Sequence, residues 1–214
     1  MRITHYCVIK LPEIKVNGSV IFNLSAAGPQ EFLKSAYRNL NIGYPKFFKM
    51  DSLCKLAFLS AEVLLKDHEI TRRYDAHQIG IILQNSSSSL EVDEKHQESI
   101  SDRQNYFPSP AVFVYTLPNI MIGEIAIRHK IKGENAVLIS ELPDARQLFE
   151  YVNENFLRNR VKCCITGRVE SYHGTMSACL MLVEKQGAIT SFVEPEEMFI
   201  FGLSNFERIF NEAL

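Results

Sequence analysis

The chain has 214 residues, which is the size of one domain, and we expect a single domain over residues 1–214. With 46% hydrophobic and 22% charged residues it is too apolar to be disordered, and a net charge of −2 gives no electrostatic reason to expect a nucleic-acid partner. No apolar run approaches the roughly 18 residues of a membrane span, and the first ten residues lack the apolar core of a signal peptide. We therefore expect a cytoplasmic protein with no membrane span.

The 5 cysteines show neither a C-x-x-C pair nor a Cys/His spacing typical of a metal site. Their odd number and the absence of a leader favour reduced thiols over a disulfide scaffold. We expect no metal and no cofactor.

The N-terminal part of the chain predicts two short strands and two helices. β-branched and aromatic runs predict strands over 6–10 and 18–24, and a short helix is predicted over 30–40. A longer helix is predicted over 50–65 with Asp51 as its N-cap. Because apolar residues surround most of its circumference, we expect this helix to be buried.

The middle of the chain predicts a central strand followed by a loop. The wholly apolar run 79–83 is typical of a strand covered on both faces. The serines at 86–89 form either a flexible connection or a loop at the carboxyl edge of the sheet, where α/β proteins place their sites. The polar segment 91–104 predicts an exposed helix or a mobile segment, and 119–130 predicts a mostly apolar helix. Gly123 inside that helix indicates close packing, since a helical glycine costs up to about 1 kcal/mol against alanine.

The C-terminal part continues the alternation of strands and helices. Strands are predicted over 136–139, 161–166, 178–183 and 198–201. Pro143 predicts the first turn of one helix, and a capping box of Ser204 and Glu207 predicts the start of the last one. The fold class is therefore α/β, with a mixed and mostly parallel sheet flanked by helices.

Chemical motifs are scarce. The sequence contains no G-x-S-x-G, no phosphate-binding loop and no dinucleotide fingerprint. The pattern of interest is Ile139-Ser140-Glu141-Leu142-Pro143, which predicts an elbow between a strand and a helix. A residue in such an elbow lies near the positive end of the helix dipole, a place that lowers a thiol pKa or holds an anion, yet this elbow carries no thiol.

The stretch from Ser109 to about Gly167 resembles the N-terminal half of β-ketoacyl synthases, which are enzymes of the thiolase superfamily. Similarity lies in the family's Ser-Pro-Phe segment, its Asn-Met-x-x-Gly helix and its Arg/Lys-Gly-Pro turn, matched here by Ser109-Pro110, Asn119, Gly123, Ile127 and Lys132-Gly133. Upstream, Lys49-Met50-Asp51 and the strand 79–82 with its serine loop also resemble family motifs, as does the strand from Cys179 to Glu184. The resemblance covers most of residues 45–185 and implies a thiolase-like half-fold.

The departures from the family pattern concern the catalytic residues. Counted without gaps from Gly133, the family's nucleophilic cysteine falls on Leu142, which cannot form a thioester. The two histidines of active ketosynthases belong to the family's C-terminal half, and the chain ends before that half. The resemblance therefore implies no catalytic residue, with Ser140, Glu141 and Leu142 lining the place of the lost nucleophile.

Short chains of this kind resemble the chain-length-factor-like subunits of aryl-polyene and flexirubin-type pathways. Such subunits are non-catalytic and pair with a full-length ketosynthase, which supplies the nucleophile. The resemblance implies a dimer seam, with a ketosynthase or with a second copy, at Leu117, Asn119, Met121, Gly123 and Ile127. It also implies docking of an acidic acyl carrier protein on basic residues, namely Arg128, Lys130, Lys132, Arg158 and Arg160.

Two other interpretations stay open. A residual acyltransferase or thioesterase would use Ser140 or one of Cys163, Cys164 and Cys179, and it needs a nearby base that the sequence does not show. A homodimeric module that binds an acyl chain or a carrier protein would need no ketosynthase.

Overall fold

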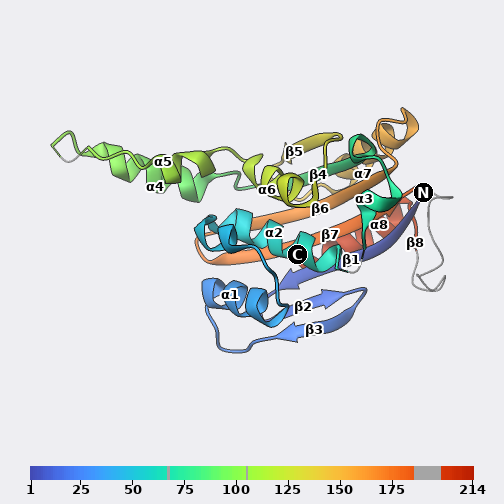
Figure 1. Cartoon of the computed structure of the whole chain (residues 1–214), viewed down its shortest axis with the longest axis horizontal. Helices are drawn as coiled ribbons and strands as arrows, with labels where there is room; N and C mark the ends of the chain where they lie inside the picture. Colours follow the sequence, from blue (N-terminus) through green and yellow to red (C-terminus); the bar gives the residue numbers. More distant parts are fainter. Residues whose placement is uncertain (67, 105, 186–198) are drawn as a thin grey trace.

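The computed structural model describes residues 1–66, 68–104, 106–185 and 199–214. Within them an eight-stranded sheet forms the middle layer, in the order β3-β2-β1-β7-β6-β4-β5, and β8 pairs with β1 off this path (Figure 1). The strands are β1 (Arg2–Lys10), β2 (Glu13–Val16), β3 (Ser19–Asn23), β4 (Ile79–Asn85), β5 (Asn135–Ile139), β6 (Cys163–Tyr172), β7 (Thr175–Glu184) and β8 (Phe199–Ile200).

Helices cover both faces of the sheet. The helices are α1 (Pro29–Asn39), α2 (Ser52–Leu64), α3 (Ile70–Arg73), α4 (Leu90–Ser101), α5 (Pro110–Phe113), α6 (Ile120–His129), α7 (Ala145–Leu157) and α8 (Leu203–Phe210). The 3₁₀ turns of the described residues are η1 (Pro45–Lys49), η2 (Ala76–Gln78), η3 (Val114–Thr116) and η5 (Asn211–Ala213). α1, α2 and α6 pack on one face, and α7 and α8 pack on the other.

The sheet separates two hydrophobic cores, one on each face, because successive side chains along a strand point to opposite faces. Along β7, Leu180 and Leu182 face the core under α2, whereas Met181 and Val183 face the core under α7 and α8. α2 is buried around most of its circumference, as predicted, and the carboxylate of Asp51 caps it by accepting from the backbone N–H groups of Leu53 and Cys54.

The sheet is mixed, as the sequence predicts. β4 runs parallel to β5 and to β6, so the core of the sheet is parallel. The other pairings are antiparallel, because β6 and β7 form a long hairpin and β1, β2 and β3 form a meander beside it. Over the whole sheet, antiparallel pairing therefore outweighs parallel pairing.

Two predicted helix starts and one predicted strand differ from the structure. α7 begins at Ala145 with Asp144 as its N-cap, so Pro143 precedes the helix, because the Asp144 carboxylate accepts from the Gln147 N–H. α8 begins at Leu203 after Gly202, so Ser204 lies inside the helix and forms no capping box. Of the predicted strand 198–201, residue 198 lies outside the described residues, and β8 is Phe199–Ile200.

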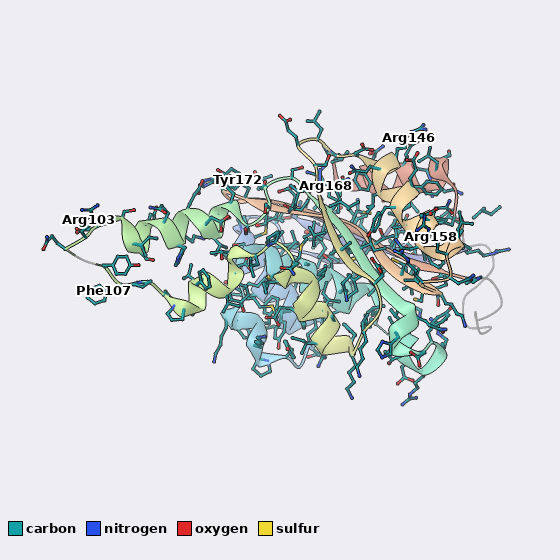
Figure 2. The ribbon with its side chains drawn as sticks, turned by 90° about the horizontal axis from the view of Figure 1, so that it is seen from above. Arg103, Phe107, Arg146, Arg158, Arg168 and Tyr172 are labelled. Carbon is teal, nitrogen blue, oxygen red and sulfur yellow. The ribbon has the colours of Figure 1, made fainter. Side chains whose placement is uncertain are left out.

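The segment 91–104 is largely helical. α4 and α5 form an arm that projects from the body, with Phe107 near its tip (Figures 1 and 2). By length and composition alone, α5–η3 and α6 together resemble a broken membrane span bent by 96°; no single helix of the described residues is long and apolar enough to be one.

His5 gives the fold a predicted dependence on pH. Burial, the nearby His68 and the charge of Arg73 lower the pKa of His5 from 6.5 to about 4, and the rings of His5 and His68 lie 3.8 Å apart. As the pH falls, His5 is therefore protonated in the unfolded chain before it is protonated in the folded one. The contribution of neutral His5 to the free energy of unfolding is fully present above pH 6.5 and is lost as the pH falls toward 4. We expect the free energy of unfolding to fall by roughly 1–2 kcal/mol over this window, since His5 is partly exposed.

Urea unfolding at pH 7.0 and pH 4.5 measures this effect. His5→Gln should remove most of the difference, whereas His77→Gln, at an exposed histidine, should leave it unchanged. Equal pH dependence in the wild type and His5→Gln would contradict the assignment.

Candidate functional site

The carboxyl ends of β4, β5 and β6 meet at one edge of the sheet, and three segments gather there. They are the serine loop after β4, the elbow between β5 and α7, and the last residues of β6. The loop and the elbow are joined directly, because the backbone N–H of Ser140 donates to the carbonyl of Asn85 at 3.0 Å.

A glutamine from β4 fixes the end of the elbow. The Gln84 amide donates to the carbonyl of Asp144 at 3.0 Å and accepts from its N–H at 2.9 Å. The Ser140 hydroxyl donates to the carbonyl of Leu142 at 2.6 Å. Leu142 itself is 74% exposed, and Glu141 is exposed beside it, so in this chain both lie on the surface rather than inside a closed pocket.

The serine loop is organised around a carboxylate of its own chain. Glu170 accepts from the backbone N–H groups of Ser86 at 2.8 Å and Ser87 at 3.1 Å. Arg168 binds the same carboxylate at 2.9 Å and donates to the Ser86 hydroxyl at 2.8 Å. Burial alone would raise the pKa of Glu170, but hydrogen bonds from Ser87, Ser86 and Arg168 outweigh it and hold the pKa below its usual range.

Carboxylates of this chain thus engage several backbone N–H donors at this edge. The first turn of α7 is capped by Asp144, and the amides of the serine loop are held by Glu170. These carboxylates occupy donors that could otherwise bind an anion.

The cysteine alternatives lack an accessible thiol. Cys163, Cys164 and Cys179 are fully buried, and burial raises the pKa of each thiol. A buried neutral thiol is a poor nucleophile. Among the described residues, no group of three or more His, Cys, Asp or Glu side chains is placed to hold a metal ion.

The predicted seam residues lie mostly on one outward stripe. Leu117 is 56% exposed, Ile127 is 66% exposed, and Asn119 is exposed on the turn before α6. No atom of the described chain lies within 4 Å of the position a Gly123 side chain would take, so the close packing inferred for Gly123 is not made inside the chain. Met121 is fully buried in the core and supports this stripe only from beneath.

The predicted carrier-docking residues gather at the other end of the parallel strands. Lys132 precedes β5, and Arg158 and Arg160 precede β6, whereas the elbow follows β5 and Tyr172 ends β6. Figure 2 shows Arg158 and Tyr172 at opposite ends of the molecule's central strands. Two of the five guanidinium and ammonium groups are engaged: Arg128 with Glu62, and Arg158 with Glu154. Lys130, Lys132 and Arg160 are exposed.

Sequence analysis missed the residues that build this edge. The hydrogen bonds that build it join residues 60 to 85 positions apart, and no local sequence pattern reveals such pairs. The residues are Gln84, Asn85, Arg168 and Glu170. One signal for them was available in the sequence. Arg168 and Glu170 follow an apolar strand and, being two positions apart, lie on the same face of it. Charged side chains buried in a strand require partners.

No protein-family model and no curated relative matches the sequence. Several solved structures, however, are similar to this one. The ishigamide ketosynthase/chain length factor is 17% identical with a TM-score of 0.65, over 88% of this chain and 63% of that one. The ketosynthase ApeO in complex with its chain length factor ApeC from Xenorhabdus doucetiae is 16% identical with a TM-score of 0.56, over 86% and 78%. A β-ketoacyl synthase from Burkholderia phymatum is 11% identical with a TM-score of 0.59, over 86% and 58%.

These likenesses establish the fold. The chain has the thiolase-like fold of β-ketoacyl synthases, as the sequence resemblance implied. Ketosynthase/chain length factor structures are among those it resembles. The chain spans less than two thirds of the length of the first of these structures.

Proposed function

We propose that this protein is a non-catalytic, chain-length-factor-like subunit that pairs with an active ketosynthase in polyene-type or other polyketide or fatty-acid-type synthesis. The elbow carries the proposal. The resemblance puts the family's nucleophile at Leu142, which is not a nucleophile, and backbone N–H groups at this edge of the sheet are bound by the carboxylates of Asp144 and Glu170. The likeness to ketosynthase/chain length factor structures supports the same assignment.

An exposed surface supports pairing with another chain. β5 is an edge strand of the sheet, so the backbone groups on its outer side face away from β4. Exposed apolar side chains lie on this strand, on the neighbouring helices and on the elbow: Phe113, Val114, Leu117, Ile127, Ile139 and Leu142. Exposed apolar groups in such number on adjoining elements are typical of a protein interface.

Co-expression with the nearest encoded full-length ketosynthase tests the proposal. We expect a one-to-one complex by size and mass, with condensing activity that neither chain has alone. Ile127→Glu should abolish the complex, because it places a charge on the seam, while Leu157→Glu, at a leucine 64% exposed at the end of α7, should not. A self-dimer that ignores the ketosynthase would favour the homodimeric binding module and overturn the pairing.

Carrier-protein docking remains part of the proposal in a narrower form. Lys130, Lys132 and Arg160 are exposed and available to an acidic partner. They are separated from the elbow by the length of β5, about 15 Å for five residues of strand. We therefore propose that a carrier protein bound there serves the assembled pair rather than the elbow of this chain.

A further inference from the structure

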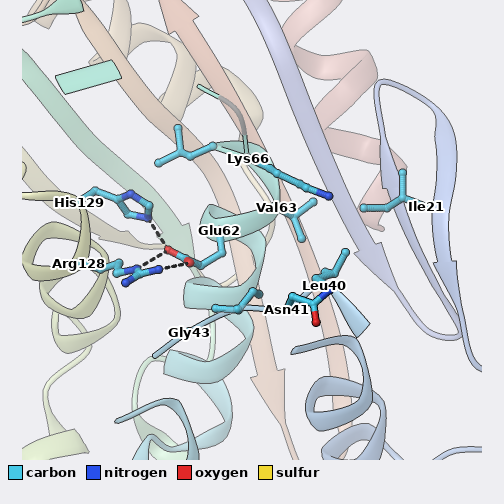
Figure 3. A pocket seen from close by; sticks show the side chains of 11 residues that line it. Ile21, Leu40, Asn41, Gly43, Glu62, Val63, Lys66, Arg128 and His129 are labelled. Carbon is cyan, nitrogen blue, oxygen red and sulfur yellow. Dashed lines mark hydrogen bonds and ion pairs between the residues drawn. The ribbon is translucent and has the colours of Figure 1, made fainter. Parts of the chain in front are cut away.

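Two adjoining cavities of about 340 Å³ and 470 Å³ lie between the C-terminal ends of α2 and α6. Leu65, Arg128 and His129 line both, so we treat the cavities as one groove. Figure 3 shows the first cavity. Their sizes are those of small-molecule sites. The groove lies near the amino end of β5 and is separate from the elbow.

A fixed guanidinium lies at the middle of the groove. Two nitrogens of Arg128 bind the two carboxylate oxygens of Glu62, each at 3.0 Å, and its guanidinium lies 5.3 Å from the ring centre of Tyr44. His129 Nε2 lies 2.9 Å from the same carboxylate. Burial alone would raise the pKa of Glu62, but bonds from His129 and Arg128 outweigh it and keep the pKa low. The Arg128 guanidinium is therefore held in place before any ligand arrives.

Positive charge exceeds negative charge along the groove. Glu62 is matched by Arg128, and Glu69 is matched by Arg72 at 2.5 Å. Lys66 lines the first cavity and Lys130 the second, and neither forms an ion pair with a described residue. Among the residues that the structure describes, these two ammonium groups of the groove have no carboxylate partner.

The first cavity also has an apolar side. Ile21 from β3, Leu40 after the end of α1 and Val63 from α2 line it on the side away from Arg128 and His129, and the Lys66 side chain extends toward Ile21 and Val63 (Figure 3). Ile21 is 41% exposed, which leaves apolar surface available to a ligand. A ligand that fills both parts must combine an anionic group with a short apolar portion.

We propose that this groove binds a small amphiphilic anion. A phosphate or carboxylate group binds the cationic side chains of the groove, Lys66 and Lys130, with Arg128 between the two cavities. The apolar portion lies along Ile21, Leu40 and Val63. Charge-assisted hydrogen bonds supply the recognition of the anion, and burial of the apolar part adds affinity. This site goes beyond the proposed pairing function and does not depend on it.

Calorimetric titration of the full chain with octyl phosphate, octanoate, octanol and inorganic phosphate tests the proposal. We expect one of the two eight-carbon anions to bind at least about tenfold more tightly than neutral octanol and than inorganic phosphate. Tighter binding of octyl phosphate assigns a phosphate-bearing ligand, and tighter binding of octanoate assigns a carboxylate. Equal affinity for octanol, or no binding of either anion, overturns the proposal.

Variants locate the binding. Lys66→Gln combined with Lys130→Asn should weaken the anion at least about tenfold, and asparagine suits the left-handed backbone of position 130. Lys49→Gln, at an exposed lysine outside the groove, is the matched control and should bind as the wild type does. Circular dichroism checks that each variant is folded. Unchanged affinity in the folded double variant would place the ligand elsewhere and overturn the proposal.

Discussion

Replacing Gly167 by alanine is expected to prevent most of the protein from folding. Gly167 lies in β6 with φ of +147°, and a side chain there would lie 1.9 Å from the carbonyl oxygen of Cys179 on β7. β6 and β7 are neighbours along ten residue pairs, so neither backbone can withdraw without breaking their hydrogen bonds. We expect a loss of at least about 4 kcal/mol, close to the whole stability of an ordinary domain.

Gly174→Ala is the matched control for this prediction. Gly174 also has positive φ, +83°, but no atom lies within 4 Å of the added carbon. Its replacement should therefore cost only the backbone strain, roughly 1–2 kcal/mol. Soluble yield and urea unfolding followed by circular dichroism measure both variants, and equal midpoints would show that β6 and β7 are not paired as described.

The second large effect is expected for Glu170→Gln. Glutamine keeps the shape of the side chain but removes the negative charge, and Arg168, which is only 7% exposed, is left without its counter-charge. Removing one partner of a buried ion pair costs about 3–5 kcal/mol. The serine loop should loosen with it, because the amides of Ser86 and Ser87 lose their charged acceptor.

An exposed ion pair serves as the control for Glu170→Gln, and urea unfolding at several pH values tests whether the charge of Glu170 is responsible. Glu154→Gln breaks the exposed pair with Arg158 and should cost no more than about 1 kcal/mol. The lowered pKa of Glu170 means that its contribution is present above the carboxyl pKa of the unfolded chain, about 4.3, and is lost as the pH falls through the folded value. The gap between the wild type and Glu170→Gln in urea unfolding should therefore narrow below pH 4, and a constant gap would rule out the charge as its cause.

The sequence predicted the elements whose signals are local. α2 with its Asp51 cap and the fully buried β4 follow from patterns within a dozen residues, and both are confirmed. β6 was expected to end near Thr166, but it continues to Tyr172, because Gly167 and the charged Arg168 interrupt the apolar pattern while their backbones still pair with β7. Helix starts failed where a competing cap, such as Asp144, lay one residue from the predicted one.

The site was less accessible to sequence reasoning than the fold. The elbow was predicted because strand, turn and helix signals follow one another along the chain. The hydrogen bonds to Glu170 were not predicted. Their donors, the backbone N–H groups of Ser86 and Ser87, come from a loop more than 80 residues earlier, and the parallel pairing of β4 with β6 brings them to Glu170. The exposure of Leu142 likewise depends on packing.

The buried thiols can be used to measure local unfolding of this chain. All five cysteines are buried, and they occupy β1, α2, β6 and β7. Alkylation then requires the surrounding segment to open, so the labelling rate of each thiol measures how often that segment opens in native buffer. Mass spectrometry of partly labelled chains would therefore rank α2 against the central strands by local stability, with no engineered probe.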